Sequence, residues 1–139
     1  YDVKSIVLRY FNVYGPREPI KGEYAPVIGL FKRQKAAGNP MTIVGDGSQR
    51  RDFTYIDDVV DANICAMNNF DIDSGFGIYN IGTGKNYTIS EIAAMIGGKT
   101  ISIEKRPAEV YETLADISES QKDLSWSPNH DLSDKINEY

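Results

Sequence analysis

The stretch from Gly45 to Asp58 constrains this chain most, because it combines a tight turn with two neighbouring arginines. Its Gly-Asp-Gly start can adopt backbone conformations that are closed to other residues, and it lets a ligand approach the main chain. Arg50 and Arg51 follow, and guanidinium is the side chain best shaped to bind a phosphate through two parallel hydrogen bonds. A hairpin turn with solvated arginines would have the same sequence, so the motif alone leaves both interpretations open.

The residues after the arginines predict a short strand and then a helix. Phe53 and Tyr55 alternate with polar neighbours, as in a half-buried strand. Asp57 occupies the position of a helix N-cap, and this role is favoured over that of a general base for Asp57 and Asp58. The helix is expected to run to about Asn69 and to bury Val59, Ala62, Ala66 and Phe70.

Strand and helix patterns alternate along the rest of the chain, which is typical of an α/β fold. Ile6 to Leu8 are consecutive apolar residues, as in a parallel strand that is buried on both faces. Thr88 and Glu91 have the spacing of a capping box. We expect further strands at 41–44, 78–81 and 101–103, and further helices at 26–37, 88–96, 118–124 with Ser118 as its cap, and 132–139.

The composition argues against several classes of function. The 139 residues suffice for one domain with a real core, and the net charge of −5 makes a broad nucleic-acid surface unexpected. Cys65 is the one cysteine and His130 the one histidine, so we expect a buried thiol and neither a disulfide nor a zinc site. No apolar run approaches the roughly 18 residues of a membrane span, and no signal peptide is evident, which favours the cytoplasm.

The chain begins at Tyr1 without a methionine and enters an apolar strand almost at once. A parallel strand of this kind needs neighbouring strands, and the chain supplies few. We therefore expect the sequence to be a fragment whose amino-terminal part is missing.

Several predicted turns could converge on one ligand. Strands of an open α/β sheet present their carboxyl ends to a common crevice. Asn12 ends the first strand, Gly82 to Gly84 end a later one, and Arg51 lies in the central turn. Arg106 could supply a second phosphate contact.

A set of segments carries a resemblance that is more specific than any single turn. In chain order they are Arg9–Arg17, Gly45–Val59, Tyr79–Gly84, Leu114–Ser118 and Leu124–Pro128. Together they resemble the extended short-chain dehydrogenase/reductase family, which includes the nucleotide-sugar epimerases and dehydratases. The chain looks most like UDP-glucose or UDP-N-acetylglucosamine 4-epimerases, because Arg-Pro-Ala-Glu-Val is followed by Leu-Ala-Asp-Ile-Ser. The resemblance implies the carboxyl-terminal part of a Rossmann-type fold, with the last sheet strands and a small substrate-binding lobe.

The resemblance also implies contacts to the nucleotide. Arg51 and Arg106 match the two arginines that bind the diphosphate, and charge-assisted hydrogen bonds suit them to it. Glu109 matches the acidic residue that accepts hydrogen bonds from the ribose hydroxyls. Because the match falls on Arg51, we expect Arg50 to be solvated.

The sugar and the base have their own matching residues. Asn12 matches an asparagine that touches the nucleotide sugar, and Tyr10 and Phe11 would line the nicotinamide and sugar side. The nucleotide side would be lined by Val27, Leu30, Phe31, Ile43 and Val44.

Two motifs of the family do not occur in this sequence, namely the Gly-x-x-Gly-x-x-Gly turn and the Tyr-x-x-x-Lys pair. The resemblance therefore implies no catalytic residue within the chain, and NAD bound mainly by the missing part. Residues 1–17, 51–70 and 78–84 would return to the Rossmann sheet, and 18–50 and 85–139 would mainly build the substrate-binding lobe.

The implied parent is a homodimeric, NAD-dependent 4-epimerase that oxidises its UDP-sugar transiently at C4, whereas the fragment alone would be inactive. Three alternatives stay open. They are a nucleotide-sugar 4,6-dehydratase, a UDP-glucuronate decarboxylase and a non-catalytic nucleotide-binding protein on the same fold.

Overall fold

The computed structural model describes residues 4–20, 26–71, 73, 75–105 and 110–139, and it confirms the α/β class. Helices and strands alternate along most of the chain. In order they are β1 (Ser5–Tyr10), β2 (Val13–Tyr14), α1 (Val27–Ala36), β3 (Met41–Val44), β4 (Arg50–Asp52), β5 (Thr54–Tyr55), α2 (Ile56–Asn69), β6 (Phe76–Ile81), β7 (Asn86–Thr88), α3 (Ile89–Ile96), β8 (Thr100–Ile103), α4 (Ser118–Leu124) and α5 (Leu132–Lys135).

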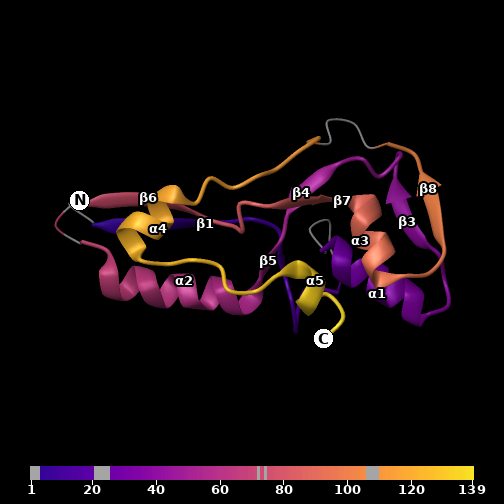
Figure 1. Ribbon diagram of the computed structural model, residues 1–139, viewed down its shortest axis with the longest axis horizontal. Coiled ribbons are helices and arrows are strands. Elements are labelled where there is room, and N and C mark those ends of the chain that lie inside the picture. The colour runs from indigo at the N-terminus through magenta and orange to yellow at the C-terminus, as the bar shows by residue number, and fades with distance from the viewer. Residues whose placement is uncertain (1–3, 21–25, 72, 74, 106–109) are drawn as a thin grey trace.

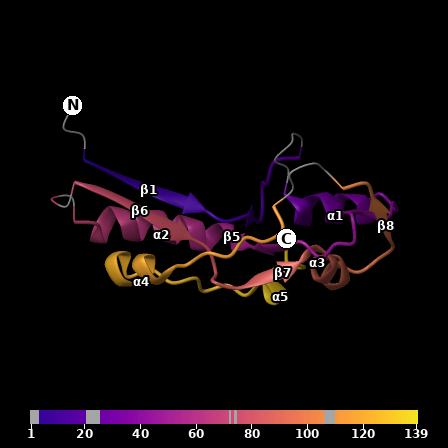
Figure 2. The same ribbon diagram turned by 90° about the horizontal axis from the view of Figure 1, so that it is seen from above.

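The molecule is elongated, with one group of elements toward each end and β4, β5, β7 and α5 between them (Figure 1). We call the part with β1, β6, α2 and α4 the β1–β6 end, and the part with α1, α3, β3 and β8 the α1–α3 end. Figure 2 shows α2 and α1 at opposite ends of the long axis, with the carboxyl terminus between them. Among the described residues the strands pair two by two: β1–β6, β2–β5 and β3–β8 are parallel, and β4–β7 is antiparallel.

Each end has its own apolar core. At the α1–α3 end, Ile28 and Phe31 of α1 pack with Met41 of β3 and Ile92 of α3, and all four side chains are fully buried. At the β1–β6 end, α2 and α4 pack against the strand pair, with Trp126 in the centre. Both cores follow from the same rule, since a helix buries one stripe and a strand buries alternate residues.

The predicted capping box is confirmed at the start of α3. Thr88 accepts a hydrogen bond from the Glu91 amide at 3.0 Å, and the Glu91 carboxylate accepts one from the Thr88 amide at 2.6 Å. At the other end of the same helix, the Lys35 ammonium donates to the carbonyl of Ile96. Both ends of α3 are thus bonded by side chains, as helix termini require.

Two predicted caps are wrong by one or two positions. Helix α2 begins at Ile56 with Tyr55 at its N-cap, and Asp57 lies exposed in the first turn, where its charge still suits the helix dipole. Helix α4 begins at Ser118 itself, and the Asp116 carboxylate accepts hydrogen bonds from the Ser118 amide and hydroxyl. The last predicted helix is also too long, since α5 ends at Lys135.

The predicted half-buried strand around Phe53 and Tyr55 is also wrong in detail. Both side chains are buried, and so is Thr54 between them. The reason is that the strand is interrupted at Phe53: β4 pairs with β7 on one side of the break, and β5 pairs with β2 on the other. Alternation cannot persist across a change of partner.

The described residues cover only one face of strand β1. Ile6 and Leu8 pack toward α2, whereas Val7 and the paired Ile78 are each 42% exposed. Burial on both faces is therefore not observed here. Cys65, expected to be buried, is half-buried at the margin of the same core. No helix in the described part of the chain has the length and apolarity needed to cross a bilayer.

Candidate functional site

Two of the polar residues predicted to bind a ligand, Asn12 and Arg51, meet where the two ends join. Asn12 follows β1 with a backbone φ of 32°, a left-handed conformation that asparagine tolerates better than most residues. Its side-chain Nδ2 donates to the carbonyl of Asp52 at 2.7 Å and to the hydroxyl of Thr113 at 3.2 Å. Asn12 is thereby tied to β4 and to a segment 101 residues further along the chain.

That segment, Val110–Leu114, runs beside β4, and we call it the 110–114 segment. The Arg50 amide donates to the carbonyl of Tyr111 at 2.8 Å, and the Thr113 amide donates back to the carbonyl of Arg50 at 3.0 Å. The Asp52 amide donates to the carbonyl of Thr113 at 3.1 Å. The segment thus has strand-like backbone bonds to β4, which fix its distance from Asn12.

Arg51 contacts the same segment. Its Nη1 donates to the carbonyl of Arg50 at 2.8 Å and to that of Tyr111 at 3.2 Å, and the residue is half-buried. A guanidinium has five N–H donors in a planar fork, so these bonds orient the group. Asn12 and Arg51, which were predicted separately, therefore both donate hydrogen bonds to the 110–114 segment.

We call the region where Asn12, β4, β7 and the 110–114 segment meet the junction. Asp52 of β4 belongs to it, and its role was not predicted from the sequence. Its side chain is fully buried, and its carboxylate accepts four hydrogen bonds, from the Thr83 amide and hydroxyl and from the amides of Gly84 and Ala115. A buried charge needs such partners. Gly82 passes so close that a Cβ there would lie 2.3 Å from the Ala115 Cβ. The signal in the sequence was weak, since an aspartate after two arginines resembles a surface residue.

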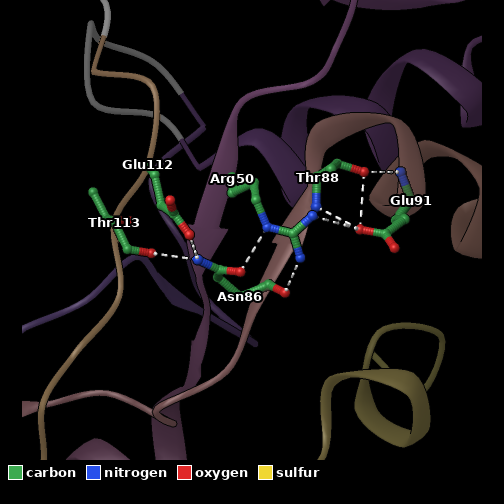
Figure 3. A network of polar contacts seen from close by, with 6 residues as sticks. All are labelled: Arg50, Asn86, Thr88, Glu91, Glu112 and Thr113. Atoms are coloured by element: carbon green, nitrogen blue, oxygen red, sulfur yellow. Dashed lines mark hydrogen bonds and ion pairs between the residues drawn. The ribbon is translucent and has the colours of Figure 1, made fainter.

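The expectation that Arg50 is solvated is wrong. Its Nε donates to Asn86 Oδ1 at 2.7 Å and its Nη2 to the Asn86 carbonyl at 2.9 Å, while Glu91 lies 4.0 Å away on the other side (Figure 3). Asn86 in turn donates from Nδ2 to Glu112 at 2.6 Å. Arg50 is a bonded member of the junction because β7 lies beside β4.

The residues expected on the nucleotide side lie at the α1–α3 end. Phe31 and Ile43 are buried in its core, so their side chains pack against protein. Val27, Leu30 and Val44 are half-buried. The described contacts do not join these five residues to Asn12 or Arg51. Arg106 and Glu109 lie outside the described residues.

The two residues expected near NAD lie at the end of β1. Tyr10 is 47% exposed, and its hydroxyl donates to Asn63 at 3.1 Å. Phe11 is held by its backbone, which bonds to the carbonyl of Ile81 and accepts from the Thr54 hydroxyl. An exposed aromatic ring can border a nicotinamide, but these two residues offer no donor set for a pyrophosphate. Tyr10 and Phe11 can therefore border an NAD site, but they do not supply its pyrophosphate contacts.

A second buried carboxylate lies away from the junction. Asp58 accepts hydrogen bonds from the amides of Asn129 and His130, and it lies 2.8 Å from His130 Nδ1. These bonds attach the carboxyl-terminal segment to the first turn of α2. Within the described ranges no group of three or more His, Cys, Asp or Glu side chains is arranged to hold a metal ion.

Hydrogen bonds also set the acidity of carboxylates around α3. Bonds from the Thr88 amide and hydroxyl, aided by the charge of Arg50, hold the pKa of Glu91 below its usual range. In the neighbouring turn, bonds from Ser48 lower the pKa of Asp46. Both groups are thus charged over a wide pH range, which keeps a negative charge at the start of α3.

The sequence matches one protein-family model and is similar to several epimerases and decarboxylases. It matches the NAD dependent epimerase/dehydratase family over residues 1–82. It is 38% identical over 142 residues to a putative UDP-glucose 4-epimerase of Methanocaldococcus jannaschii, covering 98% of this chain and 44% of that protein. It is 42% identical over 99 residues to a UDP-N-acetyl-alpha-D-glucosaminuronate decarboxylase of Bacillus cytotoxicus, covering 71% and 30%.

A solved epimerase structure is also similar to this chain. The crystal structure of UDP-glucose 4-epimerase with UDP-glucose from Thermotoga maritima superposes with a TM-score of 0.86 at 33% identity, covering 94% of this chain and 43% of the other. This likeness and the parallel strands that end in a polar junction define a Rossmann-type epimerase fold. The chain belongs to the NAD dependent epimerase/dehydratase family. It spans 44% of the length of its Methanocaldococcus relative.

Proposed function

We propose that this chain supplies UDP-sugar-binding residues of an NAD-dependent nucleotide-sugar 4-epimerase. The observation that carries the proposal is the shared attachment of Asn12 and Arg51 to the 110–114 segment. One residue comes from the carboxyl end of a parallel strand, where open α/β sheets bind ligands. The other is a cation of the shape that suits a diphosphate.

Each residue has a role in this proposal. Arg51 and Arg106 bind the two phosphates, and Glu109 accepts hydrogen bonds from the ribose hydroxyls. Asn12 contacts the sugar. Val27, Leu30 and Val44 border the nucleotide, whereas Phe31 and Ile43 support them from the core.

When bound, NAD would supply the reversible hydride-transfer chemistry at sugar C4. The part of this chain in that step is to bind and orient: Tyr10 and Phe11 border the nicotinamide, and Asn12 and Arg51 hold the UDP-sugar. We propose no catalytic residue among these 139 residues. The division into a sheet part and a substrate-binding part, and a homodimeric state, stay predictions.

A second candidate is a UDP-glucuronate decarboxylase or a 4,6-dehydratase. The similarity to the Bacillus cytotoxicus decarboxylase, whose substrate is a related UDP-sugar acid, favours the decarboxylase. It would use the same nucleotide contacts and differ in the chemical step after oxidation at C4. The third candidate is a nucleotide-binding protein on the same fold that has no catalytic activity.

The test is to supply the complete natural protein with NAD and, separately, UDP-glucose and UDP-glucuronate. A 4-epimerase converts each substrate to its C4 epimer with no loss of mass, whereas a decarboxylase releases carbon dioxide from UDP-glucuronate and a dehydratase releases water. Binding of UDP-sugar without turnover would favour the third candidate. Absence of UDP and UDP-sugar binding by calorimetry would refute the proposal in all its forms.

A further inference from the structure

Asn86, at the start of β7, links three stretches that are far apart in the sequence. Its Oδ1 and its carbonyl both accept hydrogen bonds from the Arg50 guanidinium of β4 (Figure 3). Its Nδ2 donates to the Glu112 carboxylate at 2.6 Å and more weakly to the Thr113 carbonyl at 3.4 Å. The amide of Asn86 therefore joins β4 and β7 to the 110–114 segment.

The Arg50 guanidinium is bonded on two sides. Two parallel bonds to one residue fix the plane of a guanidinium. The opposite side of Arg50 faces Glu91, which the capping box of α3 holds in place. Asn86 is thus oriented by a well-packed helix and strand pair, and it passes that orientation on to Glu112.

The 110–114 segment is bonded to β4 through its backbone, and the contacts of Asn86 add a side-chain link to these bonds. It carries the partners of both predicted ligand-binding residues: the Thr113 hydroxyl for Asn12, and the Tyr111 carbonyl for Arg51. Asn12 uses its Nδ2 for Asp52 and Thr113. The group that it can offer a ligand is therefore the acceptor Oδ1, which suits a sugar hydroxyl.

We propose, resting on the function above, that Asn86 and Thr113 are positioning residues of the UDP-sugar site. Backbone bonds hold the 110–114 segment to β4, and Asn86 adds a side-chain link from β7 that sets the position of Glu112 and Thr113 beside Arg51. Thr113 acts more locally, because it sets the direction of the Asn12 amide. Loss of Asn86 should therefore affect nucleotide and sugar recognition together, and loss of the Thr113 hydroxyl should affect the sugar alone.

Calorimetry on the complete natural protein tests this with two probes. They are UDP and whichever of UDP-glucose and UDP-glucuronate binds more tightly. Thr113→Val keeps the side-chain shape without the hydroxyl. It should leave UDP affinity within about twofold and weaken UDP-sugar affinity about tenfold, the factor of one lost directional contact. Thr113→Ser retains a hydroxyl and should restore most of the loss. Asn86→Leu should weaken both probes about tenfold.

Asn69→Leu is the matched control. Asn69 also donates from Nδ2 to a distant carbonyl, that of Leu124 at 2.8 Å, but at the β1–β6 end. It should lower the melting temperature as Asn86→Leu does and leave both affinities unchanged. A purely structural role for Asn86 would give the two variants the same result.

The outcomes separate the two proposals. A wild-type protein that binds neither probe refutes the proposed function. A wild-type protein that binds both, with Thr113→Val and Asn86→Leu at wild-type affinity, refutes the positioning role alone. Equal losses of UDP and UDP-sugar affinity in Thr113→Val would also overturn it. If Asn86→Leu does not fold, Asn86→Asp takes its place, because it keeps an acceptor for Arg50 and removes the donor to Glu112; wild-type affinity for both probes in that variant would refute the role of Asn86.

Discussion

The two ends of the molecule bury their apolar residues differently. At the α1–α3 end, α1, β3 and α3 enclose Phe31 completely. At the β1–β6 end, Trp126 is buried under α2, yet Val7 on the strand pair is 42% exposed and Met67 on α2 is 85% exposed. The same periodic patterns occur at both ends. The difference teaches that a pattern specifies which residues are apolar, while burial depends on the elements that cover them.

The junction between the ends is held by polar contacts. Asp52 joins β4 to the turn after β6 and to Ala115, and Arg50 joins β4 to Asn86 of β7. Hydrogen bonds are directional, so this junction can set geometry more sharply than apolar packing.

The largest effect is expected from the closed core. Phe31→Ala should lower the free energy of unfolding by about 3–5 kcal/mol, because it removes buried contacts and leaves a cavity. Met67→Ala, an exposed apolar residue at the other end, should stay within about 0.5 kcal/mol. Urea denaturation measures both. Similar losses would mean that Met67 is covered in solution, and the comparison of the two ends would fail.

A somewhat smaller loss is expected at the junction. Asp52→Ala leaves the amides of Thr83, Gly84 and Ala115 without their acceptor. Stranded buried donors of this kind should cost about 3 kcal/mol of unfolding free energy in the same denaturation experiment. Asp46→Ala is the control, since the Asp46 carboxylate is exposed and accepts its hydrogen bonds from Ser48 two residues away. A loss for Asp52→Ala no greater than that for Asp46→Ala would show that the junction adds little stability.

The third effect falls on binding. Arg51→Ala should weaken UDP-sugar affinity about 10- to 150-fold, which corresponds to about 1.5–3 kcal/mol for charge-assisted bonds. Lys122→Ala, which removes an 84% exposed charge on α4, should not change affinity when measured by the same calorimetry. Arg50→Ala is no neutral control, because its side chain holds Asn86. Equal UDP-sugar affinities for Arg51→Ala and Lys122→Ala would show that Arg51 does not bind the UDP-sugar. For Arg106→Ala we expect the same loss as for Arg51→Ala.

The smallest effect concerns pH. Hydrogen bonds from Thr88 keep the folded-state pKa of Glu91 below that of the unfolded chain. Its stabilising contribution is therefore present above the unfolded pKa of about 4.3 and is lost as the pH falls through the lower folded pKa. Glu91→Gln should lower the melting temperature at neutral pH and approach wild type under strongly acidic conditions. Glu119→Gln removes a carboxylate from the first turn of α4, which has no side-chain cap, and should show a smaller difference. If both variants respond alike, the capping box has no special share in the effect.

Features that depend on residues close together in the sequence could be predicted, whereas features that depend on distant residues could not. The Thr88–Glu91 box could be predicted because its partners are three residues apart. Asp57 and Asp58 both suit a helix start, but Asp58 binds His130, 72 residues away. Arg50 and Arg51 are identical residues, and only the pairing of β4 with β7 shows that Arg50 binds Asn86.

The amino-acid sequence by itself determined the α/β class and the residue types available to a phosphate ligand. It also determined where helices α1 and α3 begin and end, to within about one residue. These depend on backbone preferences and on side chains within a few positions of one another. Only the tertiary structure decided that Asp52 is a buried anchor, that Phe31 and Ile43 belong to the core, and that Asn12 and Arg51 meet on the 110–114 segment. The physical reason is that burial and long-range hydrogen bonds depend on which distant segments pack together, and neighbouring residues in the sequence carry little of that information.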